Sequence, residues 1–163
     1  MAQENQEQQW PGVDAAFGFV IPSYQWTITR FEAVDSRIQT LQAFVLTFTF
    51  GLPVIVRTLS ENIYFASTWF ILGVSFAALT IFLGIVARSW SGITVPSPGV
   101  MFEKWLDLDE WTFKKDAIFF AGQHFEDNAR LINMKGRMVS WMTFLFILEG
   151  TCLFLWIIFS YRQ

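Results

Sequence analysis

The stretch MVSWMTFLFILEGTCLFLWIIFSY, residues 138–161, decides the fold class of this chain. It holds a single charged residue, Glu149, and it is closed by Arg137 and Arg162. A hydrocarbon layer about 30 Å thick is crossed by roughly 20 apolar residues of helix, because each residue adds about 1.5 Å. The stretch is therefore long enough to span a membrane as an α-helix.

Two more runs, 38–56 and 62–87, contain no charged side chain at all. The composition agrees with a membrane protein, since 53% hydrophobic and 18% aromatic residues are high values for a soluble domain. We therefore expect an all-α integral membrane protein with three transmembrane helices, at about 38–58, 65–87 and 138–160.

Several classes of function are disfavoured by the residues that the chain carries. A net charge of -3 with scattered basic residues argues against a nucleic-acid partner. The single cysteine, Cys152, cannot build a disulfide framework or a Cys-rich metal site. We find no arrangement of nucleophile and base, no phosphate loop and no metal cluster in the sequence. We expect no enzyme activity, no cofactor and no metal, and the lipid bilayer as the first partner.

The chain is expected to begin with an irregular or disordered tail, residues 1–22, followed by one helical membrane domain, residues 23–163. Residues 23–39 carry apolar side chains at spacings of three and four, with no proline after Pro22. This pattern predicts a helical lead-in that continues without a break into the first span.

Spans one and two are predicted to form an antiparallel hairpin, closed by a tight turn from Arg57 to Phe65. Pro53 is expected to kink the first span near its outer end. Each of the two spans has a face of small residues, which lets helix backbones approach closely in lipid. The predicted packing faces are Gly73, Ala77, Thr80, Gly84 and Ala87 in the second span, and Thr40, Ala43, Thr47 and Gly51 in the first.

A cytoplasmic amphipathic helix is predicted at about 108–137, after a connector rich in Ser, Gly and Pro. Asp107 or Asp109 would cap its first turn. The helix would either pack on the lead-in or lie on the inner membrane surface. We favour packing, because surface-seeking helices are usually rich in Lys and Arg on the polar side, whereas acids and bases are mixed here.

Basic residues predict the orientation. Most of the Lys and Arg residues lie in the lead-in and in the stretch from Arg88 to Arg137, and few lie in the other loops. Cytoplasmic segments next to spans carry this excess. We expect the N-terminus in the cytoplasm and the C-terminus outside.

His124 is the only histidine, and Asp127 and Asn128 follow it at helical spacing. This is too small a set for a metal site within one chain, so we interpret His124 as a packing or surface residue. No histidine lies in the three predicted spans, which disfavours a haem held there by imidazole.

Glu149 is the one ionisable group expected at lipid depth. A central charge opposes insertion by about 3 kcal/mol, which the apolar residues of the span outweigh. Small residues from Ser140 to Thr151 cluster on one face, and Glu149 falls nearly opposite them. If the small face packs on the hairpin, the carboxyl points away from its own bundle. It would then face lipid, another subunit or a pore.

The order of a helical lead-in, a spanning hairpin, a Pro-containing connector and an amphipathic helix before a further span resembles small bacterial membrane proteins of the SLATT and Pycsar-effector type. The string EWTFKKDAIFFAGQHFEDNARLINMKGRMVSWMTFLF, with Asn128, Asn133 and Lys135, carries the resemblance. The resemblance implies a defence effector that assembles in the inner membrane and breaches it when triggered. The chain departs from it by lacking a recognisable nucleotide-sensing domain.

Two functions stay open at this point. The chain could be an oligomeric membrane-disrupting effector or channel, with Glu149 in the pathway. It could instead be an accessory subunit of a larger membrane complex, in which Glu149 pairs with a polar group of a partner span. We rank the effector first on the resemblance.

Overall fold

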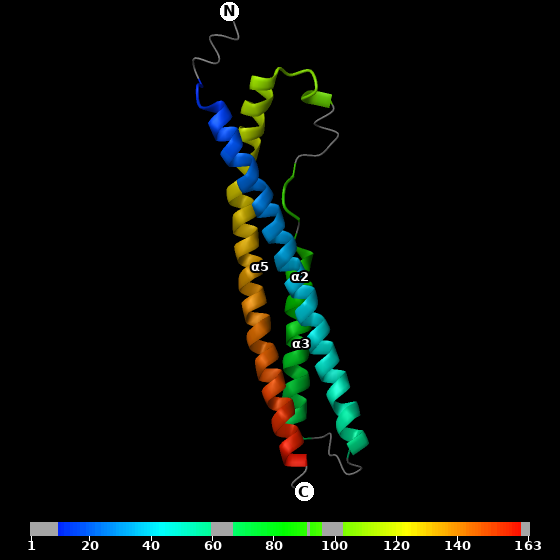
Figure 1. The fold of residues 1–163 in the computed structure, drawn as a ribbon. Helices are drawn as coiled ribbons and strands as arrows, with labels where there is room; N and C mark the ends of the chain where they lie inside the picture. Colours follow the sequence, from blue (N-terminus) through cyan, green and yellow to red (C-terminus); the bar gives the residue numbers. More distant parts are fainter. Residues whose placement is uncertain (1–9, 60–66, 91, 96–102, 161–163) are drawn as a thin grey trace, which may run out of the picture. The chain divides into compact units, whose positions relative to one another are not determined.

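A computed structural model describes residues 10–59, 67–90, 92–95 and 103–160, and no strand occurs among them. Three long helices follow one another: α2 (Val13–Leu59), α3 (Thr68–Ser89) and α5 (Glu110–Ser160) (Figure 1). Their 47, 22 and 51 residues correspond to about 70, 33 and 77 Å at 1.5 Å per residue. Each of the three is long and apolar enough to cross a membrane. The predicted all-helical architecture with three candidate spans is confirmed.

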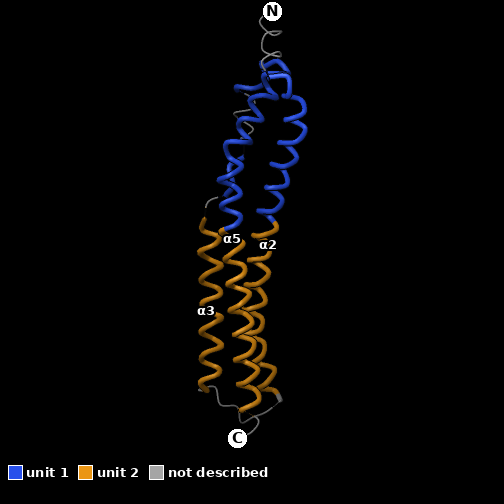
Figure 2. Tube along the Cα trace, turned by 90° about the vertical axis from the view of Figure 1, so that its left-hand side faces the viewer, with its two compact units in different colours: residues 1–32, 92–133 blue, residues 33–91, 134–163 orange. Residues whose placement is uncertain are grey.

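The chain divides into two compact units, coloured separately in Figure 2. Unit 1 comprises Met1–Glu32 and Gly92–Asn133, and unit 2 comprises Ala33–Ser91 and Met134–Gln163. The sequence had suggested one domain over residues 23–163, on the reasoning that the apolar spans alone form a core. Residues outside the spans bury side chains too. Those of unit 1 include Tyr24, Thr27, Ala117, Ala121 and Asn128.

The start of α2 corrects the prediction of an irregular tail over residues 1–22. Residues 1–9 lie outside the described residues, but the helix begins at Val13 and Pro22 lies inside it. A proline removes one backbone hydrogen bond of a helix. Tertiary packing supplies most helix stability in proteins, and Val13 and Tyr24, on either side of Pro22, are each only 7% exposed. Packing in unit 1 thus outweighs the missing bond.

The lead-in and the first predicted span form one continuous helix, as the sequence predicted. α2 also continues through Pro53 and ends at Leu59. The predicted turn from Arg57 to Phe65 falls mostly on residues 60–66, which lie outside the described residues.

α5 joins two elements that the sequence had separated. The predicted cytoplasmic helix, 108–137, and the predicted third span, 138–160, are a single helix from Glu110 to Ser160. Asp109 caps the start, as expected: its Oδ1 accepts a hydrogen bond from the backbone N–H of Thr112 at 3.0 Å. Gly136, at the predicted junction, has no positive φ and does not interrupt the helix.

Within unit 2, α3 runs antiparallel to α2. Ile38, near the start of the unit 2 part of α2, clusters with Ala87 at the end of α3. Phe70, at the start of α3, packs on the cluster that contains Val56 of α2. Between these two levels the side-chain amide of Gln42 donates to the backbone oxygen of Ile81 at 3.4 Å. The predicted hairpin arrangement of the two helices is therefore present.

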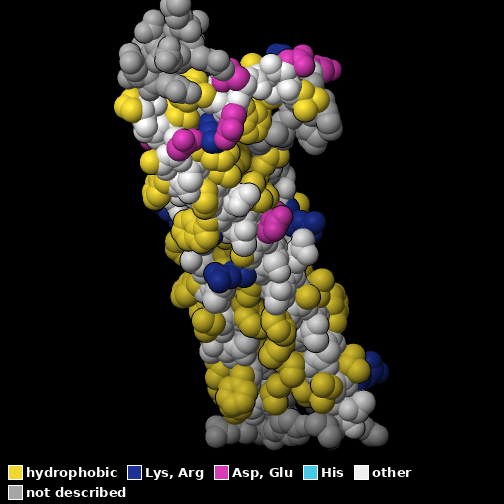
Figure 3. All heavy atoms as spheres, turned by 45° about the horizontal axis from the view of Figure 1, so that its top comes forward, with side chains coloured by type: hydrophobic (Ala, Val, Ile, Leu, Met, Phe, Trp, Pro, Cys, Tyr) yellow, Lys and Arg dark blue, Asp and Glu magenta, His cyan; other side chains and the backbone are white. Residues whose placement is uncertain are grey.

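Large apolar side chains cover much of the outer surface of unit 2. Many hydrophobic side chains lie at the surface on the face drawn in Figure 3. Phe50 is 68% exposed, Phe82 60% and Phe154 62%, one from each of the three helices. Exposed apolar surface of this kind is typical of contact with a membrane or with another protein.

Candidate functional site

The inner face of α5 is marked by a row of residues spaced by seven. Each member of the row is at most 3% exposed. A seven-residue repeat keeps one side of a helix turned toward a parallel neighbour along its whole length. Within unit 2 the row is Lys135, Met142, Glu149 and Trp156. Two of its members, Lys135 and Glu149, carry ionisable groups.

Lys135 and Glu149 each contact the residue of α2 that lies 100 positions earlier in the sequence. Lys135 Nζ lies 2.9 Å from Asp35 Oδ1, and Thr49 Oγ1 lies 2.6 Å from Glu149 Oε1; each pair is separated by 100 residues in sequence. A constant offset means that α2 and α5 run parallel through unit 2 and stay in register. Asp35 and Thr49 are two heptads apart, as Lys135 and Glu149 are.

Glu149 is fully buried inside unit 2, with 0% of its surface exposed. Its Oε1 contacts the Thr49 hydroxyl, and its Oε2 is buried without a hydrogen-bond partner among the described residues. The prediction that this carboxyl points away from its own bundle is wrong. The group faces α2 of the same chain.

Glu149 points inward because of the side chains that pack on the small-residue face of α3. Gly73, Ala77, Thr80, Gly84 and Ala87 are the buried residues of α3, so the face chosen from the sequence is its inner face. A Cβ added at Gly73 would lie 3.0 Å from Leu153 Cδ2. One added at Gly84 would meet the Gln42 side chain of α2 first and would lie 3.0 Å from Met142 Cε of α5. Large side chains of α5 thus contact both glycines, and Gln42 of α2 shares the space at Gly84. The bulky face of α5 therefore turns inward and takes Glu149 with it.

The small faces of the other two spans lie outside, against the prediction that they pack within the hairpin. Ala43 and Thr47 of α2 are exposed, and a Cβ added at Gly51 would meet nothing within 4 Å. On α5 the small face is exposed at Ser140, Thr143, Ile147 and Thr151. The inner positions of α2 are instead taken by residues such as Ile38, Val45 and Val56.

Sequence reasoning missed the ion pair of Lys135 and Asp35. The Lys135 side chain is 1% exposed, whereas that of Asp35 is 30% exposed. From the sequence, Lys135 counts among the basic residues that set orientation and belongs to the string that carries the resemblance, and neither role places it in an ion pair. Its distance of two heptads from Glu149, with Met142 between them, was the available signal of a shared inner face.

In unit 1 a buried amide ties the connector to α5. Asn128 is 3% exposed; its Oδ1 accepts from Thr94 N–H at 3.0 Å and its Nδ2 donates to Thr94 O at 3.2 Å. The Tyr24 hydroxyl of α2 donates to the same Thr94 oxygen. The Asn128 side-chain amide thus satisfies both the N–H and the carbonyl oxygen of Thr94, as the backbone of a neighbouring strand would.

His124 packs against the ring of Phe120, with the ring centroids 4.6 Å apart. The described part of the chain contains no group of three or more His, Cys, Asp or Glu side chains placed to hold a metal ion. Asn128, the residue four positions after His124, is engaged with Thr94.

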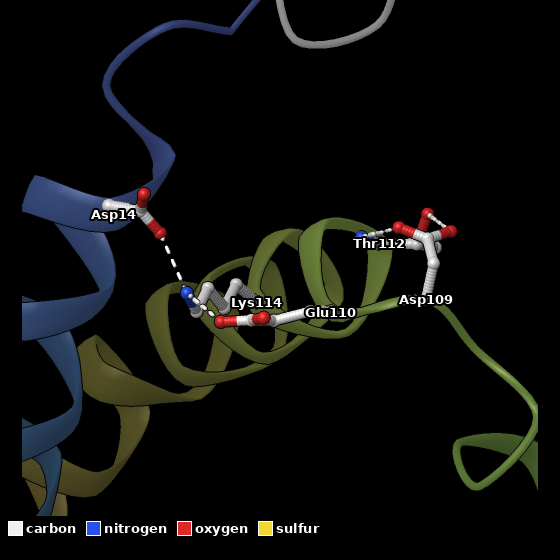
Figure 4. Close-up of polar contacts among 5 residues, drawn as sticks. All are labelled: Asp14, Asp109, Glu110, Thr112 and Lys114. Carbon is white, nitrogen blue, oxygen red and sulfur yellow. Dashed lines mark hydrogen bonds and ion pairs between the residues drawn. The ribbon is translucent and has the colours of Figure 1, made fainter. Parts of the chain in front are cut away.

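The beginning of α5 packs on the beginning of α2, which was the favoured alternative for the predicted cytoplasmic helix. Lys114 Nζ bridges Asp14 Oδ1 at 2.8 Å and Glu110 Oε1 at 2.5 Å (Figure 4). The bonds to Asp14 and then Glu110 raise the pKa of Lys114. The backbone N–H of Thr112, followed by its hydroxyl, lowers the pKa of Asp109. Rings of Phe17 and Phe113 add an apolar contact.

These observations define a class: an all-helical protein with three helices suited to crossing a membrane and an acidic group buried among them. No family model, no curated protein and no solved structure matches the chain.

Proposed function

We propose that the chain is a multi-pass inner-membrane protein and acts as an oligomeric channel-type or membrane-disrupting effector. Unit 2 would be the membrane part, because its surface is apolar on all three helices. The distribution of Lys and Arg supports a cytoplasmic N-terminus and an external C-terminus.

The observation that carries the proposal is the burial of Glu149 in the most apolar part of α5. An ionisable residue within a spanning helix is costly, and such residues mark ion pathways, proton relays or contacts with polar groups. The Thr49 hydroxyl contacts only one of the two carboxyl oxygens. The architecture that resembles the SLATT and Pycsar-effector type adds support, and it implies a bacterial defence role.

Assembly into an oligomer is supported by the outer small faces of α2 and α5. Lipid offers no hydrophobic drive for helix association, so small residues that allow close approach favour contacts between helices. Ala43 and Thr47 on α2, and Thr143 and Thr151 on α5, are exposed in the single chain. We propose that the α2 face of one copy packs on the α5 face of the next.

A second candidate, an accessory subunit of a larger membrane complex, is favoured by a different observation. The interior of unit 2 is filled with large side chains: Met142, Leu153 and Trp156 are each 0% exposed. A three-helix interior filled in this way leaves no room for a water-filled path within one chain, whereas its outer surface can bind other subunits. In this reading the outer small faces would dock to spans of unrelated subunits.

Expression of the chain in a bacterium, with membrane potential followed by a voltage-sensitive dye, tests the first proposal. The effector should depolarise the cells, and Glu149→Gln should change the extent or the threshold of depolarisation. Glu126→Gln, a matched change at an exposed carboxyl of unit 1, should leave depolarisation unaltered. A chain that inserts and causes no depolarisation would contradict the effector and leave the accessory role.

Assembly is tested by oxidative crosslinking of Ala43→Cys together with Thr143→Cys in a Cys152→Ser background. We expect a ladder of crosslinked copies in the bilayer. Purification of the chain with unrelated subunits, and no ladder, would support the accessory subunit instead.

A further inference from the structure

The hydrogen atoms at the contact of Thr49 and Glu149 can be counted. Thr49 Oγ1 lies 2.8 Å from the backbone oxygen of Val45 and 2.6 Å from Glu149 Oε1. A threonine hydroxyl has one hydrogen to donate, while a carbonyl and an ionised carboxylate can only accept. Both contacts are hydrogen bonds at the same time only if Glu149 carries a proton and donates it to Thr49.

The surroundings contain no charge that would stabilise an ionised Glu149. The segments packed around it are 38–56 of α2, 68–87 of α3 and 138–160 of α5, and Glu149 is the only charged residue type in them. Cys152 is the only other titratable side chain in these three segments, and it lies on α5 as Glu149 does. Lys135 lies 14 residues earlier on α5, about 21 Å along the helix.

The burial of Glu149 also favours the protonated, neutral form of its carboxyl group. Glu149 is 0% exposed, and its Oε2 has no partner among the described residues. A carboxylate without water or a counter-charge is strongly disfavoured in an apolar interior, whereas the neutral acid is tolerated. A neutral acid needs one acceptor for its proton, and Thr49 Oγ1 supplies it.

We propose that Glu149 is a proton-binding site within the three-helix unit, and that the bound proton joins α5 to α2. Removal of the proton leaves Thr49 with one hydroxyl hydrogen for two acceptors, the backbone oxygen of Val45 and the carboxylate of Glu149. Deprotonation therefore breaks one of the two hydrogen bonds and changes the contact between α2 and α5 at this level. The inference concerns the chain itself and does not depend on channel activity.

Infrared spectroscopy of the full chain in lipid nanodiscs tests this site directly. At pH 7 the wild type should show the carbonyl stretch of a protonated carboxylic acid, with a downshift in D2O. Glu149→Gln should lose this band, whereas Glu126→Gln should lose only carboxylate absorption. If Glu149→Gln loses only carboxylate absorption at pH 7, the proposal is overturned.

Thr49→Val keeps the carboxyl and removes its acceptor, so it provides a second readout should Glu149→Gln fail to fold. The acid band should persist and move to higher frequency, as expected for a carboxylic acid that has lost a hydrogen bond. An unshifted band, or no acid band in either the wild type or Thr49→Val, would contradict the proposed site.

Discussion

Thr49 of α2 and Glu149 of α5 face each other inside one chain, with Oγ1 and Oε1 2.6 Å apart. Two heptads earlier, Asp35 and Lys135 meet at the same sequence offset. Two polar contacts at one register fix how α2 and α5 are aligned, because a shift of either helix along its axis would separate both pairs. Buried polar groups often serve such specificity in helix pairs.

The coupling of Thr49 to Glu149 should be measurable by a double-mutant cycle. Thr49→Val and Glu149→Leu, alone and combined, should give an interaction of about 0.6 kcal/mol, the average for hydrogen bonds between membrane helices, and no more than about 1.7 kcal/mol, the largest such value. Unfolding in mixed micelles provides the free energies. Thr49→Val combined with Glu126→Leu, a distant control, should be additive.

Loss of one partner of the Lys135–Asp35 pair should destabilise unit 2. Asp35→Asn removes the carboxylate that lies 2.9 Å from a lysine that is 1% exposed. Breaking a buried pair costs about 3–5 kcal/mol, and we expect about 3 kcal/mol or less because the Asp35 side chain is 30% exposed. The same unfolding assay measures it.

A matched control is Asp116→Asn, whose side chain is 42% exposed and whose carboxylate lies 3.9 Å from Lys115. That change should have little effect on stability. Equal effects of the two substitutions would contradict the burial of Lys135.

The helices themselves could be predicted from charge-free runs and apolar spacing, and so could the inner face of α3 with Gly73 and Gly84. The orientation of α5 could not. Small residues allow close packing, but they do not say whether the partner presents small or large side chains. Here Leu153 contacts Gly73, and Gln42 of α2 and Met142 of α5 both contact Gly84. The rotation of α5 therefore depends on side-chain volumes across three helices rather than on one helical pattern.

The continuity of α5 was missed for a related reason. A change from charged to apolar composition at Arg137 marks a change of surroundings along the helix and not an end of the helix. The ion pair of Lys135 was hidden by the same boundary, since its partner Asp35 lies 100 residues away and only the common seven-residue spacing connects them.

Gly73 should tolerate no larger side chain. Gly73→Val places new methyl groups against Leu153, whose Cδ2 lies 3.0 Å from an ideal Cβ, and overpacking costs about 1–3 kcal/mol. Gly150→Val is the control, because a Cβ there meets nothing within 4 Å. It should leave stability unchanged or raise it slightly, since valine is the better helix former.

The cap at Asp109 should show a defined pH dependence. Its pKa is lower in the folded chain than the unfolded value of about 3.9, so the stabilisation of the first turn of α5 is present above that value and is lost as pH falls through the folded pKa. Hydrogen exchange at the Thr112 amide, compared with Asp109→Asn at each pH, should show protection that declines in acid only in the wild type. Protection with the same pH profile in both chains would rule out an ionised cap.

The central claim, that Glu149 faces α2 of its own chain, is tested most directly by Thr49→Cys combined with Glu149→Cys in a Cys152→Ser background. Mild oxidation in the bilayer should produce a disulfide within a single chain, and Thr47→Cys, on the exposed side of α2, should not pair with Glu149→Cys. Crosslinks of Glu149→Cys only to other copies, with none to Thr49→Cys in the same chain, would contradict the account.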